Sequence, residues 1–415
     1  MKRFKHLCAL AFICLVHLSA SSQEAKIDSS QTITLRIDPQ NARGAAVSQI
    51  FDDVKFIPLE TTKESLFGNI AQLKVSGDKF LIYDYDTRSV LVFNKSGKYI
   101  TKIDAAKLQT DKADKQKAES HGFTLHNEAG TEYIVIYTPN NMQFFTLDGK
   151  FVKKVKEIKD ASGLSFQNGE TEIKPFLSIK KGKDSTFYKV ATINKKTKDT
   201  LAYFKVDLKI FEKDDWFGDA TVSKYNDNEA FFTDFYTYRL YKLKSDKMEL
   251  AYKFILPAIN TLPKDFITNP EYVKKRFEYF EKNKKIIHGI GKSYLIGDKL
   301  FLKFLNVFWD KDQKKSVIYD TKTTELLSFQ DLEPDSLSSF LPVTDSGFGY
   351  DFENRGFLAY ENKEFYTSYS SLAMMTFKER SAGKTTKYPP LLENYFKVSD
   401  RKSNPILVIL KPKQN

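Results

Sequence analysis

Cysteine is nearly absent from this sequence, and both cysteines lie at its start. Cys8 and Cys14 fall in a segment that begins with basic residues, continues as an apolar run over 7–18 and ends in small residues. This pattern is typical of a secretory signal peptide, so we expect residues 1–22 to be removed. The mature chain then has no disulfide, no thiol nucleophile and no cysteine metal ligand.

Long hydrophobic runs are also lacking. The apolar run of the leader is too short to span a bilayer, and we expect no transmembrane segment after its removal. A lipid-anchored cysteine needs small residues before it, but Phe12 and Ile13 precede Cys14, and His6 and Leu7 precede Cys8. The sequence therefore predicts soluble export, to the periplasm or to the extracellular space or cell surface.

Clustered charge of one sign is missing as well. The formal charge is +12, and +9 remains once the three basic residues of the leader are removed. The lysines are scattered among acids, which is typical of a solvated surface. A nucleic-acid face needs clustered Lys and Arg with stacking aromatics, so we expect no nucleic-acid partner. Attraction to acidic glycans or to an anionic membrane surface stays open.

Glycine and proline are scarce, with 18 and 13 residues, whereas Phe and Tyr are abundant, with 35 and 22. This composition favours a packed, β-rich protein over a disordered one. Short stretches of alternating apolar and polar residues are separated by turns such as Ser76-Gly77-Asp78 and Asp148-Gly149. Such turns are typical of antiparallel hairpins.

The short strands group into six sets of four. The first set comprises 70–75, 79–84, 89–93 and 99–103, and the other sets begin near residues 122, 163, 220, 293 and 347. Sheets that repeat at about fifty residues predict an all-β fold, a six-bladed β-propeller of four-stranded antiparallel blades. Two separate β-sandwiches are the alternative.

Three segments depart from the strand pattern. Residues 264–284 have helical character and predict a short helical insertion between blades 4 and 5. Residues 388–396 open with a proline pair and predict a second short helix. Residues 104–120 are rich in Lys, Asp, Ala and Gln and predict a mobile or helical excursion.

The ends of the chain set the predicted domain limits. We expect residues 23–50 to form an N-terminal arm with one short strand at 33–37, and residues 51–415 to form the propeller. A ring of blades must pair its ends or expose an edge. The strand at 54–59 is therefore predicted to supply the outer strand of the last blade, and Pro58 restricts it to an edge position.

Four segments carry a family resemblance. They are the opening Val54-Lys55-Phe56-Ile57-Pro58-Leu59-Glu60-Thr61, the first-blade residues Asp84, Val92-Phe93 and Gly97-Lys98, the fourth-blade segment Tyr238-Arg239-Leu240-Tyr241 with its exit at 254–263, and the terminal strand 404–409. With them, residues 54–413 resemble the secreted six-bladed β-propeller proteins of Bacteroidetes, which are distantly similar to NHL-type propellers. The resemblance implies fold and export, because most members have no assigned activity. Members often have a Gly-rich loop after the first blade, but residues 104–120 contain no glycine.

Few residues have the chemistry of a catalytic centre. The mature chain has three histidines, His121, His126 and His288, and their spacing matches no zinc motif. A metal pair at His121 and His126 is less favoured than two ordinary histidines. The sequence has no Gly-x-Ser-x-Gly elbow, no Walker loop and no dinucleotide fingerprint, so we expect no metal and no cofactor. A Ser-His-Asp triad stays open because geometry defines it.

The loops between the second and third strands of the blades are the candidate binding face, because in a propeller they gather at one end. The predicted ligand-binding residues are Tyr85, Arg88, Tyr236, Asn306 and Trp309, with Tyr369 just past the third strand of the last set. Aromatic rings beside amides and an arginine suit a sugar ring or an extended peptide. The alternative is that these aromatics pack between blades.

These features predict an exported, non-enzymatic binding or interaction module that presents the channel mouth to a glycan, a peptide or a protein. The alternative is a propeller-type metal-dependent hydrolase or lactonase, with Asp84, Asp234 and Asn306 near one ion. We assign no catalytic residue, and the sequence carries no signal for an oligomeric state.

The position of both cysteines in the leader predicts a thiol-free mature protein. Protein from the native host is expected to begin near Gln23 and to give no reaction in thiol titration. Intact-mass measurement checks the start, and a retained, lipidated cysteine would overturn soluble export.

Overall fold

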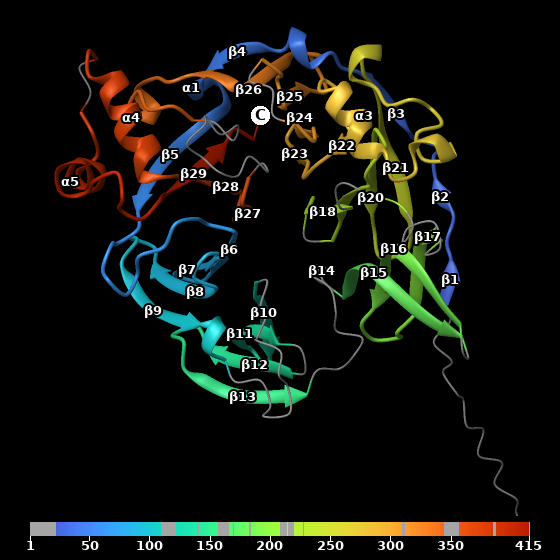
Figure 1. Ribbon diagram of the computed structural model, residues 1–415, viewed down its shortest axis with the longest axis horizontal. Helices are drawn as coiled ribbons and strands as arrows, with labels where there is room; N and C mark the ends of the chain where they lie inside the picture. Colours follow the sequence, from blue (N-terminus) through green and yellow to red (C-terminus); the bar gives the residue numbers. More distant parts are fainter. Residues whose placement is uncertain are drawn as a thin grey trace, which may run out of the picture.

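The computed structural model describes residues 22–108, 122–138, 141–156, 166–168, 170–181, 184–207, 214, 220–226, 228–308, 312–343, 357–384 and 387–414. Over these residues the chain forms six antiparallel sheets that follow one another around a central axis (Figure 1). The predicted six-bladed β-propeller of four-stranded blades is therefore confirmed. Residues 1–21, which make up nearly all of the predicted leader, lie outside the described ranges.

Blades 1 to 3 follow the predicted strand sets, each running from the innermost strand outward. Blade 1 consists of β6 (Gln72–Ser76), β7 (Lys79–Asp84), β8 (Ser89–Asn94) and β9 (Tyr99–Asp104). Blade 2 consists of β10 (Thr124–Glu128), β11 (Thr131–Thr138), β12 (Asn141–Thr146) and β13 (Phe151–Lys156). Blade 3 consists of β14 (Phe166–Asn168), β15 (Thr171–Lys181), β16 (Asp184–Asn194) and β17 (Thr200–Val206).

Blades 4 to 6 repeat this order. Blade 4 consists of β18 (Thr221–Lys224), β19 (Ala230–Thr233), β20 (Arg239–Leu243) and β21 (Met248–Ile255). Blade 5 has β22 (Gly289–Ile290) and β23 (Tyr294–Ile296) innermost, then β24 (Lys299–Leu305), β25 (Ser316–Asp320) and β26 (Leu326–Glu333). Blade 6 consists of β27 (Ala359–Glu361), β28 (Glu364–Tyr369), β29 (Ile406–Pro412) and β5 (Phe51–Pro58). The strand expected at 347–351 lies outside the described residues.

The ring is closed by pairing the two ends of the chain. The N-terminal strand β5 runs antiparallel to the C-terminal strand β29 as the outer strand of blade 6, with Val54 opposite Leu410 and Pro58 opposite Ile406. This confirms the closure predicted from the sequence. The β8–β9 turn packs against the same strand, because a Cβ on Gly97, whose φ is +80°, would lie 2.0 Å from the Pro58 carbonyl oxygen. Only glycine allows this approach.

Asn404, which is fully buried just before β29, ties the closing strand to blade 1. Its side-chain amide donates to the carbonyl oxygens of Glu60 (2.8 Å) and Ser65 (2.9 Å). Its side-chain oxygen accepts from the backbone N–H of Phe67 at 3.0 Å. One side chain therefore satisfies three backbone groups of the segment that leads from β5 into the first blade.

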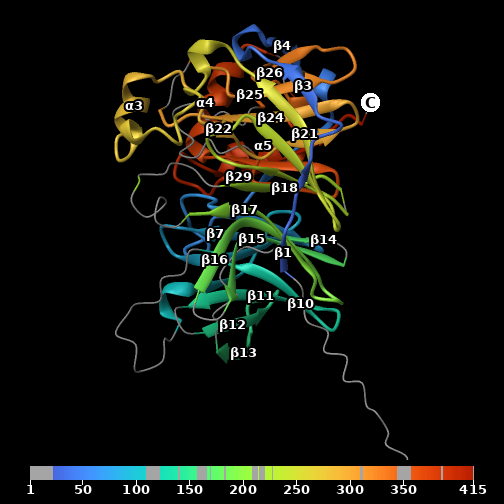
Figure 2. The same ribbon diagram turned by 90° about the vertical axis from the view of Figure 1, so that its right-hand side faces the viewer.

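The N-terminal arm contains more strands than the single one expected at 33–37. It forms β1 (Ser22–Glu24), β2 (Ile27–Asp28), β3 (Ile33–Arg36) and β4 (Arg43–Ala46). These strands pair in parallel with the outermost strands of three blades: β17, then β21, then β26. The arm is thus an outer strap on blades 3, 4 and 5 (Figures 1 and 2). Strands of two to four residues are too short to be recognised from an alternation of apolar and polar residues.

The helical segments differ from expectation in length. The insertion predicted over 264–284 contains a 3-10 turn at Pro270–Tyr272 and one short helix, α3 (Arg276–Lys282). The helix expected at 388–396 is α5 (Pro390–Val398), and α4 (Ser371–Ser381) before it was not predicted. A four-residue helix, α1 (Val47–Ile50), precedes β5. Residues 105–107 form a 3-10 turn, and 109–121 lie outside the described residues.

The hydrophobic core is divided among the spaces between neighbouring blades. Phe80 of blade 1 meets Tyr366 of blade 6 with ring centroids 6.2 Å apart, and Phe204 of blade 3 stacks on Phe232 of blade 4 at 5.5 Å. Tyr294 of blade 5 contacts Phe365 of blade 6 at 5.1 Å. Each blade therefore buries its apolar faces only when both neighbours are in place.

Removal of the closing strand tests the ring. Deletion of Phe51–Glu60 is expected to abolish cooperative thermal unfolding, because blade 6 loses its outer strand and the link to blade 1. Deletion of 22–28 is the control, since it removes only two short strap strands; this variant should keep a cooperative transition. Equal melting curves for parent and first variant would contradict the closure.

Asn404→Ala tests the buried amide. The substitution removes three hydrogen bonds and deprives the buried Ser65 carbonyl and Phe67 N–H of this partner, while the Glu60 carbonyl still accepts from the Ser65 hydroxyl; we expect the free energy of unfolding to fall by about 2–4 kcal/mol. Denaturant titration measures the change. Asn94→Ala, at the exposed β8–β9 turn, is the comparison. If it lowers the free energy of unfolding as much as Asn404→Ala does, the buried amide of Asn404 contributes no more than an exposed one.

Candidate functional site

The topology brings several connections to one end of the propeller. Because neighbouring strands are antiparallel, the loops between second and third strands emerge at the same end as the links from each outer strand to the next blade. We call this the loop end. The insertion between β21 and β22 and the α4–α5 segment between β28 and β29 belong to it. Figure 2 shows α3 standing out at one side of the ring.

The blade 1 turn presents two of the predicted residues to solvent. Tyr85 is 59% exposed and Arg88 is also exposed. The turn is held from beneath by the fully buried Asp84, whose carboxylate accepts from the backbone N–H groups of Thr87 (2.9 Å) and Asn69 (3.2 Å). Arg88 has a φ of +49°, which costs energy for a residue with a Cβ. Asp84 thus holds the backbone of the turn from which both side chains project.

Tyr236, in the equivalent turn of blade 4, is buried. Only 6% of it is exposed, in an aromatic cluster with Phe235, Phe266 and Phe280. Its ring lies 5.2 Å from that of Phe266, and its backbone N–H donates to the His288 carbonyl at 2.7 Å. The insertion therefore covers this turn, and Tyr236 is a packing residue, which was the alternative to ligand binding. Sequence reasoning treated the six turns as equivalent and did not foresee the cover.

A buried ion pair anchors the insertion. The side chains of Arg276 in α3 and Asp214 are both fully buried, and the guanidinium donates to the Asp214 carboxylate at 2.6 and 2.9 Å. The same guanidinium lies over the Phe266 ring, 4.7 Å from its centroid. A buried charge of this kind requires its partner, so the pair fixes the insertion against the segment between blades 3 and 4.

The blade 5 residues are partly placed. Asn306 is half-buried and its amide donates to the Ile286 carbonyl at 2.7 Å, whereas Trp309 lies outside the described residues. His288 packs beside Tyr236, and burial lowers the pKa of its imidazole to about 4. Among the other histidines, His126 is exposed and His121 is outside the described ranges. The described part of the chain thus places no second histidine beside His288 in the aromatic cluster.

Tyr369 of blade 6 is also buried. It is 2% exposed and meets Phe377 of α4 edge-on, with ring centroids 5.3 Å apart. The helix α4 covers it in the way that the insertion covers Tyr236. Of the five predicted residues that the structure describes, Tyr85 and Arg88 are exposed at the loop end, Tyr236 and Tyr369 are buried, and Asn306 is half-buried.

The acids proposed for a metal site have other contacts. Asp84 caps its own turn, and Asp234 accepts from the Lys189 ammonium at 2.7 and 2.8 Å. Burial raises the pKa of Asp234, while Lys189 opposes the rise. Within the described ranges, no group of three or more His, Cys, Asp and Glu side chains is arranged to hold a metal ion.

The innermost strands carry residues that the sequence did not single out. These strands surround the propeller axis (Figure 1) and are cross-linked by side chains. Gln72 of blade 1 donates to the Phe123 carbonyl next to blade 2 (2.8 Å), and Ser223 of blade 4 donates to the Ser293 carbonyl of blade 5 (2.8 Å). Lys292 of blade 5 reaches the Leu358 carbonyl beside blade 6 at 3.5 Å. No motif marks these positions, because ring closure alone brings them together.

A search of solved structures finds similar chains, of which the first agrees with the fold. A "Putative exported protein" from Bacteroides fragilis has 14% sequence identity and a TM-score of 0.60, over 92% of this chain and 99% of that chain. A member of the DUF4221 family from Bacteroides vulgatus has 10% identity and a TM-score of 0.42, over 88% and 99%. A protein of unknown function from Bacteroides caccae has 9% identity and a TM-score of 0.29, over 66% and 82%. No curated protein matches the chain.

One family profile covers nearly the whole propeller. The profile described as "Domain of unknown function (DUF4934)" matches residues 30–411, from the strap strand β3 to the closing strand β29. Together with the fold shared with the Bacteroides fragilis protein, this match confirms the family resemblance that the sequence predicted. The NHL-type likeness stays a prediction. The chain belongs to the DUF4934 family.

Proposed function

We propose that the protein is an exported, non-enzymatic binding module that presents the loop end of a rigid propeller to a glycan, a peptide or a protein. The leader pattern and the "exported" neighbour from Bacteroides fragilis support export. In the part of the chain that the structure describes, no helix is long and apolar enough to cross a membrane. Both the periplasm and the cell surface are consistent with this proposal.

The blade 1 turn is the observation that carries the proposal. The aromatic ring of Tyr85 and the guanidinium of Arg88, three positions apart, are both exposed on a turn that the buried Asp84 holds in place. A flat apolar face beside a fork of hydrogen-bond donors suits a sugar ring or an extended peptide. The positive φ of Arg88 supports a functional reason for this residue, since glycine would be more stable there.

The burial of the other aromatics narrows the proposed face. Tyr236 and Tyr369 are covered by the insertion and by α4, so the ligand contacts are assigned to the blade 1 side of the loop end. The hydrolase alternative has less support, because Asp84, Asp234 and Asn306 each have a structural partner. A metal-dependent hydrolase needs several acids around one ion, whereas a binding role does not.

Variants of the exposed turn test the proposal. The mature chain is first screened on an array of oligosaccharides and an array of extended peptides, and hits are measured by calorimetry. Tyr85→Ala and Arg88→Gly are expected to weaken binding by about 1–3 kcal/mol each, as loss of a binding anchor commonly does. Their melting temperatures should not fall, because Tyr85 is exposed and glycine suits the positive φ at 88.

Tyr236→Ala is the matched comparison. It removes a buried ring and is expected to lower the free energy of unfolding by about 3–5 kcal/mol. The proposal fails if neither array captures the chain, or if Tyr85→Ala and Arg88→Gly bind the captured ligand as the parent does.

A further inference from the structure

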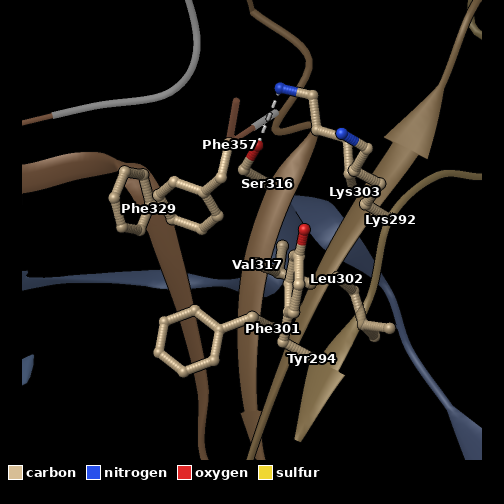
Figure 3. Close-up of a pocket in the computed structure, with 9 residues that line it drawn as sticks. All are labelled: Lys292, Tyr294, Phe301, Leu302, Lys303, Ser316, Val317, Phe329 and Phe357. Atoms are coloured by element: carbon tan, nitrogen blue, oxygen red, sulfur yellow. Dashed lines mark hydrogen bonds between the residues drawn. The ribbon is translucent and has the colours of Figure 1, made fainter. Parts of the chain in front are cut away.

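The outer edge of each blade is the part of the sheet that ring closure does not cover. The faces of neighbouring blades fill each other: Figure 3 shows Phe329 and Phe357 together at the junction of blades 5 and 6, with ring centroids 5.3 Å apart. The cavity beside them has a volume of about 10 Å³, which is the room that one water molecule needs. An outer strand, in contrast, presents backbone N–H and C=O groups to which a further strand can add.

The N-terminal strap shows that these edges accept an added strand. β1 runs parallel to β17 of blade 3, β2 and β3 to β21 of blade 4, and β4 to β26 of blade 5. Two ion pairs join the strap to these blades: Asp28 of β2 meets Lys247 at 3.5 Å, and Arg43 of β4 pairs with Glu325. In both pairs, the strap residue carries the charge opposite to that of the blade residue.

The outer strand of blade 2, β13, is the next edge along the ring. The strap strands lie on blades 3, 4 and 5 in chain order, so blade 2 adjoins the blade that carries β1 (Figure 1). Within the described residues, β13 pairs only with β12, on its inner side. Its outer edge therefore neighbours the edges that the strap covers, and no described strand lies on it.

This strand combines exposed apolar side chains with charge of one sign. Phe151 is 57% exposed and Val152 is 41% exposed. Lys154 and Lys156 are exposed as well, and the strand contains no acidic residue. Exposed apolar side chains on a strand edge favour pairing with another strand. The side chains of β13 are thus suited to an added strand that brings apolar and acidic residues.

The other two outer strands without a strap strand are less suited to a partner. β5 contains Pro58, which has no N–H to donate, and it carries Asp52 and Asp53. β9 exposes one large apolar side chain, Ile100, and ends with Asp104. Among the three edges, apolar exposure and uniform positive charge coincide only on β13.

The lysines of β13 also decide which strand can add. Pairing of β13 with the same strand of a second copy would place lysines near lysines, and like charges opposite each other on neighbouring strands are destabilising. A segment whose residues alternate between apolar and acidic covers the apolar side chains and brings carboxylates to the lysines. The charge of the edge therefore favours an acidic partner over a second copy of the chain.

We propose that β13 is a docking edge for an extended, acidic segment of a partner protein, which adds to blade 2 as a further strand. The apolar side chains of this segment cover Phe151 and Val152, and its carboxylates lie near Lys154 and Lys156. In this mode of recognition, main-chain hydrogen bonds supply the affinity and alternate side chains supply the specificity. The edge lies on the outside of the ring, so this inference goes beyond the proposed use of the loop end.

The test uses the mature chain and a short fluorescent peptide in which glutamate and valine alternate. Fluorescence anisotropy should detect binding of this peptide and much weaker binding of a matched peptide with lysine in place of glutamate. Hydrogen exchange then locates the peptide. Backbone amides of 151–156 should exchange more slowly when it is bound, whereas those of 252–255, which β3 already covers, should not change.

Two variants of the edge test the assigned contacts. Phe151→Asp and Lys156→Glu are each expected to weaken binding of the acidic peptide about fivefold or more, because each places a negative charge beside the carboxylates of the added strand. Both side chains are exposed, so the fold should persist. Lys156→Glu keeps the experiment decisive if the loss of the aromatic ring disturbs blade 2.

Lys253→Glu is the matched control. Lys253 is an exposed lysine on β21, and it lies opposite Thr34 on an edge that the strap already occupies. This variant should bind the acidic peptide as the parent does. The inference is overturned if the acidic peptide binds no better than the basic one, if exchange over 151–156 does not slow, or if Lys253→Glu weakens binding as much as Lys156→Glu.

Discussion

The pairing of β5 with β29 is the constraint on which the rest of the structure depends. Each blade has two apolar faces, and only a closed ring gives every face a neighbour. Asn404 strengthens the junction because it satisfies backbone groups of the segment between β5 and blade 1. Contacts between the first and last blades, such as Phe80 with Tyr366, exist only because this closure brings them together.

The N-terminal segment has a larger part in the ring than closure alone requires. Before it reaches blade 6 as β5, it adds a parallel strand to blades 3, 4 and 5. Ion pairs such as Lys247 with Asp28, at 3.5 Å, hold it to the outer strands. An outer strand is an exposed hydrogen-bonding edge, and the strap covers that edge on half of the blades.

The loop end is asymmetric, because some blades are covered there and blade 1 is not. The insertion with its Arg276–Asp214 pair covers blades 4 and 5, and α4 covers Tyr369 of blade 6. The blade 1 turn stays open with Tyr85 and Arg88. The two exposed residues of the proposed face thus lie on the blade 1 side of the ring.

The sequence by itself determined the strand repeat, the fold class and the closing strand. Period-two alternation and Gly-Asp turns are local signals, and a ring of blades leaves only one partner for a strand that precedes the first set. Only the tertiary structure decided which of these side chains are buried and which residues they contact. Tyr85 and Tyr236 have the same turn context in sequence, but an insertion from a distant segment covers only the second. The strap strands are too short for their sequence pattern to reveal them, and Phe80 and Tyr366, whose rings meet between blades 1 and 6, are 286 positions apart in the chain. Their proximity depends on long-range packing, which no local pattern encodes.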